Sequence, residues 1–135
     1  MTEHPNAVAL RQAFAAMAAG DLPTVLSAFA PDAVMHIRGT GPISGDHKGI
    51  EAITDVLTHG FELTGGTQKL DVREVFADAE HGVVVVHETA TRAADGVTLD
   101  VLETNLFRFG PDRRVVEFWD IPTDPKRHDD FFDGV

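Results

Sequence analysis

The sequence predicts an α+β fold, in which N-terminal helices pack on a curved antiparallel sheet and enclose a pocket. Two observations predict it. Apolar residues recur at helical spacing over residues 6–19 and 50–63, and from residue 68 to residue 121 they tend to alternate with polar ones. Helices followed by a run of hairpin-connected strands are typical of this class.

The helical segments have recognisable ends. The first, over residues 6–19, stops at Gly20. Asp21 is placed to cap a short second helix that runs to Phe29, because an aspartate side chain can accept a hydrogen bond from the first free amides of a helix. The third helix is predicted from Ile50 to about residue 63, before a pair of glycines.

The rest of the chain is predicted as strands and loops. Residues 33–38 form a short strand, and residues 39–49, with four glycines, form a loop. The later strands and a short terminal helix are predicted over residues 68–76, 83–92, 97–109, 114–121 and 126–132.

The strand over residues 97–109 is long and nearly free of strand-breaking residues. Its odd-numbered positions are the more apolar and are therefore assigned to the core, yet they include Glu103 and Asn105. An inward polar side chain costs free energy unless it is hydrogen-bonded or lines a wet cavity. This pair is the clearest indication of a functional pocket.

Length, composition and charge restrict the classes of protein. The 135 residues suit one domain spanning residues 1–135, and the absence of cysteine excludes disulfides, thiolate metal sites and thiol nucleophiles. A net charge of -11 disfavours nucleic acid as a partner. No signal-peptide pattern and no apolar run of membrane-spanning length is present, so a cytoplasmic protein without a membrane partner is expected.

Three stretches, residues 18–33, 41–49 and 106–120, resemble the nuclear transport factor 2-like superfamily, and within it a bacterial SnoaL-like group. Ketosteroid isomerase and SnoaL-like polyketide cyclases share this cone-shaped fold. The resemblance implies a single SnoaL-like domain and a small hydrophobic ligand. Through the cyclases it also implies one cavity acid or base and no cofactor. A fold alone does not fix the reaction.

The resemblance to ketosteroid isomerase does not extend to its catalytic residues. The oxyanion-hole tyrosine, the general-base aspartate and the oxyanion-hole carboxylic acid of that enzyme fall at Phe14, Ile37 and Asn105. Only Asn105 retains a hydrogen-bond donor for an oxyanion. We therefore expect a protein that is not a ketosteroid isomerase with the usual catalytic set.

Three carboxylates are predicted to share the pocket. A turn at residues 95–96 places Glu88 opposite Glu103, and a turn near residues 111–112 places Glu103 opposite Asp120. Like charges this close cannot all ionise at neutral pH, so at least one pKa is expected to be raised. In the alternative interpretation Glu88 faces solvent, and only Glu103 and Asp120 reach the pocket.

Histidines offer a second set of candidates. His36 is predicted at the pocket mouth, either as a general base or paired with Asp120; alternatively it only bonds the neighbouring loop. His87 alternates with Glu88, and we assign Glu88 to the pocket. The spacing of histidines matches no metal motif, so no metal is expected, although a site assembled from several strands stays open. Solvent exposure is expected for His4, His47, His59, His81 and His128.

The predicted lining of the pocket is apolar and suits a hydrophobic small molecule. Its predicted substrate-binding residues are Phe14, Met17, Met35, Glu88, Val101, Phe107, Phe118 and Trp119. Trp119 has two possible orientations. Without a bulge it faces the outer side of the sheet, where it would anchor a homodimer; with a bulge after Glu117 it lines the cavity.

Three functional hypotheses follow. The first is a cofactor-independent isomerase, cyclase or hydrolase acting on an apolar carbonyl- or epoxide-bearing molecule, with His36, Asp120 or Glu103 as acid or base and Asn105 at the oxyanion. The second is a non-catalytic binding module or dimeric accessory domain. The third, a partner-binding domain that uses the outer sheet, has no supporting feature in the sequence.

Overall fold

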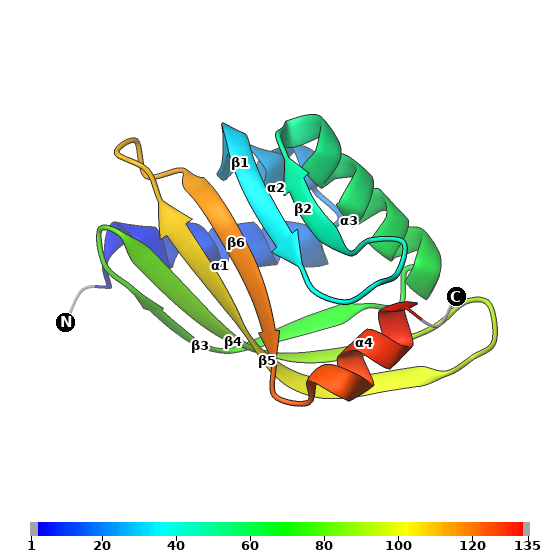
Figure 1. Ribbon diagram of the computed structural model, residues 1–135. Helices are drawn as coiled ribbons and strands as arrows, with labels where there is room; N and C mark the ends of the chain where they lie inside the picture. The colour runs from blue at the N-terminus through cyan, green and yellow to red at the C-terminus, as the bar shows by residue number, and fades with distance from the viewer. Residues whose placement is uncertain (1–2, 134–135) are drawn as a thin grey trace.

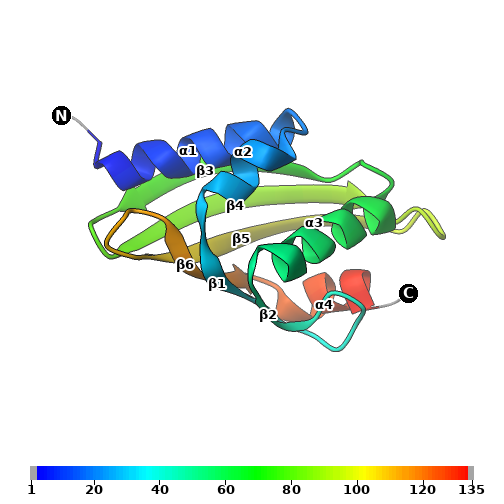
Figure 2. The same cartoon turned by 90° about the horizontal axis from the view of Figure 1, so that it is seen from above.

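The computed structural model describes residues 3–133, which form a curved six-stranded sheet with helices on its concave side (Figures 1 and 2). The strand order is β2-β1-β6-β5-β4-β3. The helices are α1 (Pro5–Ala18), α2 (Leu22–Ser27), α3 (Ile50–Thr64) and α4 (Pro125–Asp133). The strands are β1 (Phe29–Ile37), β2 (Gly45–Lys48), β3 (Lys69–Ala77), β4 (His81–Thr91), β5 (Thr98–Phe109) and β6 (Val115–Pro122).

The α+β class is confirmed, and so are the predicted cap at Asp21 and the end of the third helix at the pair of glycines. The carboxylate of Asp21 accepts a hydrogen bond from the backbone N–H of Thr24 at 3.2 Å and so caps α2. Gly65 ends α3 with a φ of 58°, in the left-handed region that glycine adopts without a steric penalty. No helix of residues 3–133 is long and apolar enough to cross a membrane.

The sheet is mixed, which corrects the predicted antiparallel sheet. Strands β3 to β6 are antiparallel neighbours, but β1 pairs with β6 in parallel. The predicted loop over residues 39–49 also contains β2, which pairs with β1 as an edge strand. Strand β2 is bound by backbone hydrogen bonds and is largely exposed, so its residues show no apolar alternation. The predicted second helix ends early, and Phe29 begins β1.

The inward direction of Glu103 and Asn105 on β5 is confirmed, since they are 3% and 4% exposed. The predicted registers are wrong by two residues. Glu88 lies opposite Val101, and Asp120 lies opposite Asn105. The β4–β5 loop is longer than a two-residue turn, and a bulge interrupts the β5–β6 pairing after Arg108. Because side chains alternate with period two, this shift leaves all three carboxylates on the concave face.

The hydrophobic core lies between the concave face and the helices. Its most buried members include Ile53 of α3, Val84 and Val86 of β4, Leu99 of β5 and Val115 of β6. Burial of these side chains supplies most of the favourable free energy that holds helices and sheet together. The polar site described next interrupts this core at the end of the sheet covered by α4.

Candidate functional site

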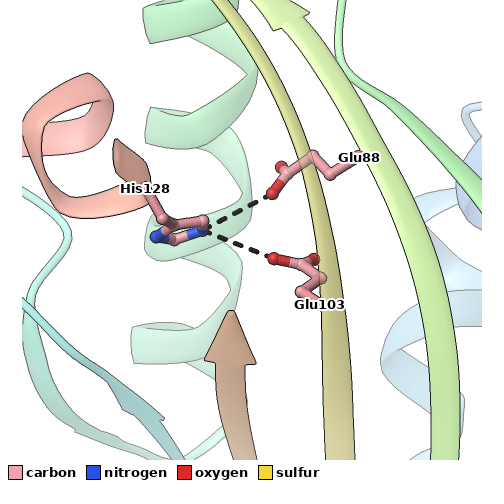
Figure 3. Close-up of side chains that lie close together, drawn as sticks. All are labelled: Glu88, Glu103 and His128. Carbon is pink, nitrogen blue, oxygen red and sulfur yellow. Dashed lines mark ion pairs between the residues drawn. The ribbon is translucent and has the colours of Figure 1, made fainter. Parts of the chain in front are cut away.

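Helix α4 covers the ends of β5 and β6 and places His128 against the concave face (Figures 1 and 3). His128 is 4% exposed, so the prediction that it is solvated is wrong. Phe131 and Phe132 are buried beside it. Residues three and four apart share one face of a helix. The spacing of His128 from these two phenylalanines was the sequence signal that would have placed it inside.

The imidazole of His128 faces three carboxylates. Its Nε2 lies 3.4 Å from Oε1 of Glu88, 3.5 Å from Oε2 of Glu103 and 3.1 Å from Oδ2 of Asp120. Figure 3 shows Glu88 and Glu103 pointing from adjacent strands toward the ring. The predicted trio of carboxylates thus shares one site, and the alternative with Glu88 in solvent is excluded by its 2% exposure. We call Glu88, Glu103, Asp120 and His128 the acidic cluster.

Two side-chain amides hold the outer oxygens of this cluster. Nδ2 of Asn105 donates to Oδ1 of Asp120 at 3.2 Å, and the amide of Gln68 donates to Oε2 of Glu88. Within residues 3–133, Oε1 of Glu88 and Oε2 of Glu103 are buried without a hydrogen-bond partner. Asp120 and Glu88 are therefore oriented by neutral donors, whereas Glu103 depends on the cluster itself.

Burial and charge determine the protonation of the cluster. Burial, together with the negative charges of Glu88 and Asp120, raises the pKa of Glu103 to about 11. Burial lowers the pKa of His128, but hydrogen bonding and charge from Asp120 and Glu88 outweigh this and raise that pKa to about 10. At neutral pH the cluster thus holds a neutral carboxylic acid and an imidazolium side by side. The raised carboxyl pKa expected from the sequence belongs to Glu103.

Polar contacts hold α4 over the cluster. The guanidinium of Arg92 donates to the backbone carbonyl of Phe131 at 2.8 Å and is fixed by Asp95 at 2.7 Å. The carboxylate of Asp133 accepts hydrogen bonds from the backbone N–H groups of Thr40 and Gly41. The glycine-rich loop and the β4–β5 hairpin therefore fix the position of the helix that carries the imidazole.

A cavity of about 860 Å³ is lined by residues of α1, α2, α3, β3 and β4. Its apolar lining residues are Phe14, Met17, Ala18, Leu22, Val25, Leu57, Phe61 and Leu70. Members of the acidic cluster are not among its lining residues, but Gln68, which donates to Glu88, is. Gln68 is thus the side chain that joins the cavity to the cluster.

The predicted substrate-binding residues do not all line the cavity: some line it, and others lie in the hydrophobic core. Phe14 and Met17 line the cavity. Phe107 lies in the packed interior, with its ring 6.2 Å from Phe14 and 5.1 Å from Phe118. The predicted positions that belong to the core and not to the cavity lining are Met35, Val101, Phe107 and Phe118.

His36 lies on the outer face of the sheet, which corrects its predicted position. Its Nδ1 lies 2.8 Å from Asp46 and its Nε2 lies 2.8 Å from Glu117, in place of the expected pairing with Asp120. It pairs in register with Trp119 of β6, and the two rings stack at 5.2 Å. The hydrogen bond to Asp46 is the main cause of a raised pKa of His36.

This geometry also decides two orientations that the sequence left open. Trp119 faces outward with His36, so it does not line the cavity. His87 likewise points away from the cluster, with Nε2 2.6 Å from Asp100, while Glu88 points inward. Both follow from strict alternation along β4 and β6.

The curved sheet closing on helices is the nuclear transport factor 2-like fold, which the chain shares with a solved structure described as an NTF2-like protein of unknown function from Burkholderia pseudomallei, at a TM-score of 0.76. The family model described as SnoaL-like domain matches residues 10–118, so the chain belongs to the SnoaL-like family.

Individual relatives cover nearly the whole chain. The uncharacterized protein Rv0034 of Mycobacterium tuberculosis is 27% identical over 90% of this chain and 94% of its own length. The structure of Bal32a, from a soil-derived mobile gene cassette, is 32% identical with a TM-score of 0.86, covering 94% of this chain and 95% of that one. TerC, co-crystallized with polyporic acid, is 21% identical with a TM-score of 0.80, covering 93% of this chain and 96% of that one.

Proposed function

We propose that this SnoaL-like protein is a cofactor-independent enzyme that binds an apolar, carbonyl- or epoxide-bearing small molecule and acts on it by acid–base chemistry. The observation that carries the proposal is the acidic cluster, buried beside a large apolar cavity and joined to it through Gln68. An apolar cavity with a few convergent polar groups is the usual form of a small-molecule site.

The cluster supplies both a base and an acid. Glu88 accepts a hydrogen bond from Gln68, which lines the cavity, and is therefore assigned the role of proton acceptor. Glu103 is neutral because burial raises its pKa, so it can donate a proton to a substrate oxygen. The two transfers balance, since one proton leaves a carbon or a water and another arrives at the oxygen.

His128 and Asn105 act as positioning residues in this proposal. The imidazolium of His128 neutralises part of the negative charge of Glu88 and Asp120. The amide donor of Asn105 is directed at Asp120, so Asn105 orients that carboxylate, a different role from the oxyanion contact expected from the sequence. His36 has no part in the proposed reaction because it lies on the opposite face.

Proton transfer can be detected before the substrate is known. We would incubate the protein with a panel of apolar ketones and epoxides in deuterated water, and measure deuterium incorporation or ring opening by mass spectrometry. Glu88→Gln and Glu103→Gln should lower the rate by roughly 10²–10⁴-fold, the usual contribution of a general acid or base. His36→Gln is the matched control and should retain the rate. Equal rates in all four proteins would reject the proposal.

A binding function without turnover is the second candidate. It is favoured by the fact that the cavity lining does not include the cluster residues themselves. Polyporic acid is the first probe, because TerC, which shares the fold, was co-crystallized with it. Saturable binding of polyporic acid that Phe14→Ala weakens, with every compound of the panel recovered unchanged, would support this candidate over the enzyme.

We also propose that the outer face of the sheet forms a homodimer. Ile121, which is 49% exposed, lies two residues from Trp119 along β6, and Leu102 of β5, which is 44% exposed, lies on the same outer face. Contiguous exposed apolar residues with an aromatic side chain are typical of interface cores. Ile121→Glu should convert a dimer to a monomer in analytical ultracentrifugation, whereas a monomeric wild type would end this proposal.

A further inference from the structure

The acidic cluster contains two buried oxygens without a hydrogen-bond partner among residues 3–133. One Nε2–H of His128 faces three carboxylate oxygens at 3.1–3.5 Å, and it can point directly at only one of them. Oε1 of Glu88 and Oε2 of Glu103 have no hydrogen-bond partner among residues 3–133, although both residues are at least 97% buried. Buried oxygens of this kind normally have a partner.

A dication at the centre would give these atoms one common partner. The ligand atoms of Glu88, Glu103 and His128 all lie within 4.8 Å of one another. A tetrahedral zinc ion with bonds of about 2.0–2.1 Å requires ligand atoms about 3.3–3.4 Å apart. The separations of Nε2 from the three oxygens, 3.4, 3.5 and 3.1 Å, are close to this edge length. Asp120 joins these three residues through its Oδ2, which lies 3.1 Å from Nε2. Binding the ion requires side-chain rotations that bring the carboxylate oxygens together.

The surrounding residues are arranged as the outer shell of such a site would be. Gln68 and Asn105 hold one oxygen of Glu88 and one of Asp120, leaving the other oxygen of each carboxylate facing Nε2. The second imidazole nitrogen, Nδ1 of His128, makes no hydrogen bond within residues 3–133. It lies 3.8 Å from Oδ1 of Asp129, which Arg38 fixes, so a small movement would bring the two into hydrogen-bond contact. Metal-binding histidines usually direct their other nitrogen at a carboxylate of this kind.

We propose that Glu88, Glu103, Asp120 and His128 form a binding site for a divalent transition-metal ion with the size and ligand preference of Zn²⁺. One imidazole with carboxylates suits such ions better than Mg²⁺, which keeps several waters. The ion would replace the protons of Glu103 and His128, because both ligands bind metal in their deprotonated forms. Three carboxylates and the ion then leave a local charge of -1.

The bound ion would have a structural and inhibitory role. Four protein donors complete a tetrahedral shell and leave no open position for water. The ion would also join α4 to three strands, because its ligands come from β4, β5, β6 and α4. Zinc should therefore stabilise the fold while removing the acid and the base that the proposed reaction uses. This inference concerns the metal-loaded cluster and can be tested without any substrate.

The test is zinc binding to protein freed of metal with a chelator, followed by titration calorimetry and thermal unfolding. We expect one buried ion per chain and a rise of several degrees in the unfolding temperature, since a ligand that binds only the folded state stabilises it. Glu88→Gln and Glu103→Gln keep side-chain size and should weaken binding by at least about ten-fold. The double variant His36→Gln, His87→Gln removes outer-face histidines and should bind zinc like the wild type.

Crystals grown with zinc would locate the ion by its anomalous scattering. A peak between Nε2 of His128 and the three carboxylates would support the site even if one variant failed to fold. A peak only at His36 and Asp46, or equal affinity in the wild type and Glu88→Gln, would overturn it. Turnover by the metal-free protein is measured separately. A failure to bind zinc would therefore leave the proposed enzyme function intact, and a failure to turn over any substrate would leave the proposed zinc site intact.

Discussion

The side-chain amide of Gln68 donates a hydrogen bond to Glu88 while Gln68 itself lines the large cavity. Gln68 precedes β3, and Glu88 lies on the neighbouring strand β4. A ligand in the cavity can therefore affect the buried cluster by competing for this one amide. Gln68 is the contact between the cavity and the acidic cluster.

Gln68→Leu should destabilise the protein by about 1–3 kcal/mol, because it leaves a second oxygen of Glu88 buried without a donor. Urea unfolding measures this change. Lys69→Gln, at the next and exposed position, is the control and should have little effect. An unchanged stability for Gln68→Leu would mean that Glu88 does not depend on this amide.

Glu103→Gln should stabilise the metal-free protein at neutral pH. A carboxyl group whose pKa is raised from 4.5 to about 11 on folding stabilises the fold fully only below pH 4.5 and loses that contribution as pH rises toward 11. At neutral pH the loss amounts to as much as about 3 kcal/mol. The glutamine side chain introduced by Glu103→Gln does not titrate, so its contribution to stability does not change with pH.

The measurement is urea unfolding of wild type and Glu103→Gln at about pH 5 and about pH 8 in the presence of chelator. The stability difference should grow in favour of the variant at the higher pH. Glu74→Gln, on the exposed part of β3, should show no such trend. A variant that becomes relatively less stable as pH rises would contradict the raised pKa of Glu103.

Arg92→Met should loosen α4 without disturbing the rest of the fold. The substitution removes the donors to the carbonyls of Asp130 and Phe131 and the ion pair with Asp95. Hydrogen bonds from a charged group contribute about 1.5–3 kcal/mol. Amide hydrogen exchange should therefore accelerate over residues 125–133. Arg114→Met removes an exposed arginine and should leave exchange there unchanged.

The ion pair between His36 and Glu117 on the outer face should stabilise the protein only within a limited pH range. Asp46 chiefly raises the pKa of His36, whose contribution is complete below about pH 6.5 and is lost as pH rises through its folded value. His36 chiefly lowers the pKa of Glu117, whose contribution is present above about pH 4.5 and is lost as pH falls. The loss of stability caused by His36→Gln should be largest between about pH 4.5 and pH 6.5 and should become smaller at higher pH. A pH-independent cost in urea unfolding would contradict the ion pair.

Alternation along one strand was enough to predict the inward direction of Glu103 and Asn105, because period two depends only on local backbone geometry. The cap at Asp21 was equally local. The registers were not, since loop length and a bulge shifted both hairpins by two residues. The clustering of the three carboxylates was still predicted correctly, because a register shift of two residues leaves each side chain on the same face of the sheet.

Features that depend on distant parts of the chain were missed. The parallel pairing of β1 with β6 joins segments about eighty residues apart along the chain, and no pattern in either strand specifies it. His128 was assigned to solvent with the other histidines of loops and helix ends, whereas the packing of α4 on the sheet buries it together with Phe131 and Phe132. His36 was assigned to the pocket from its place in the fold, whereas alternation along β1 directs it outward.

The stack of Trp119 on His36 gives the protein a built-in optical reporter. With one tryptophan and no tyrosine, nearly all of its near-ultraviolet absorption and emission arises at this site. An imidazolium quenches indole emission more strongly than a neutral imidazole does, so fluorescence should titrate with His36. The same signal should shift when the outer face becomes covered, and it should be insensitive to occupancy of the cavity, which lies across the sheet.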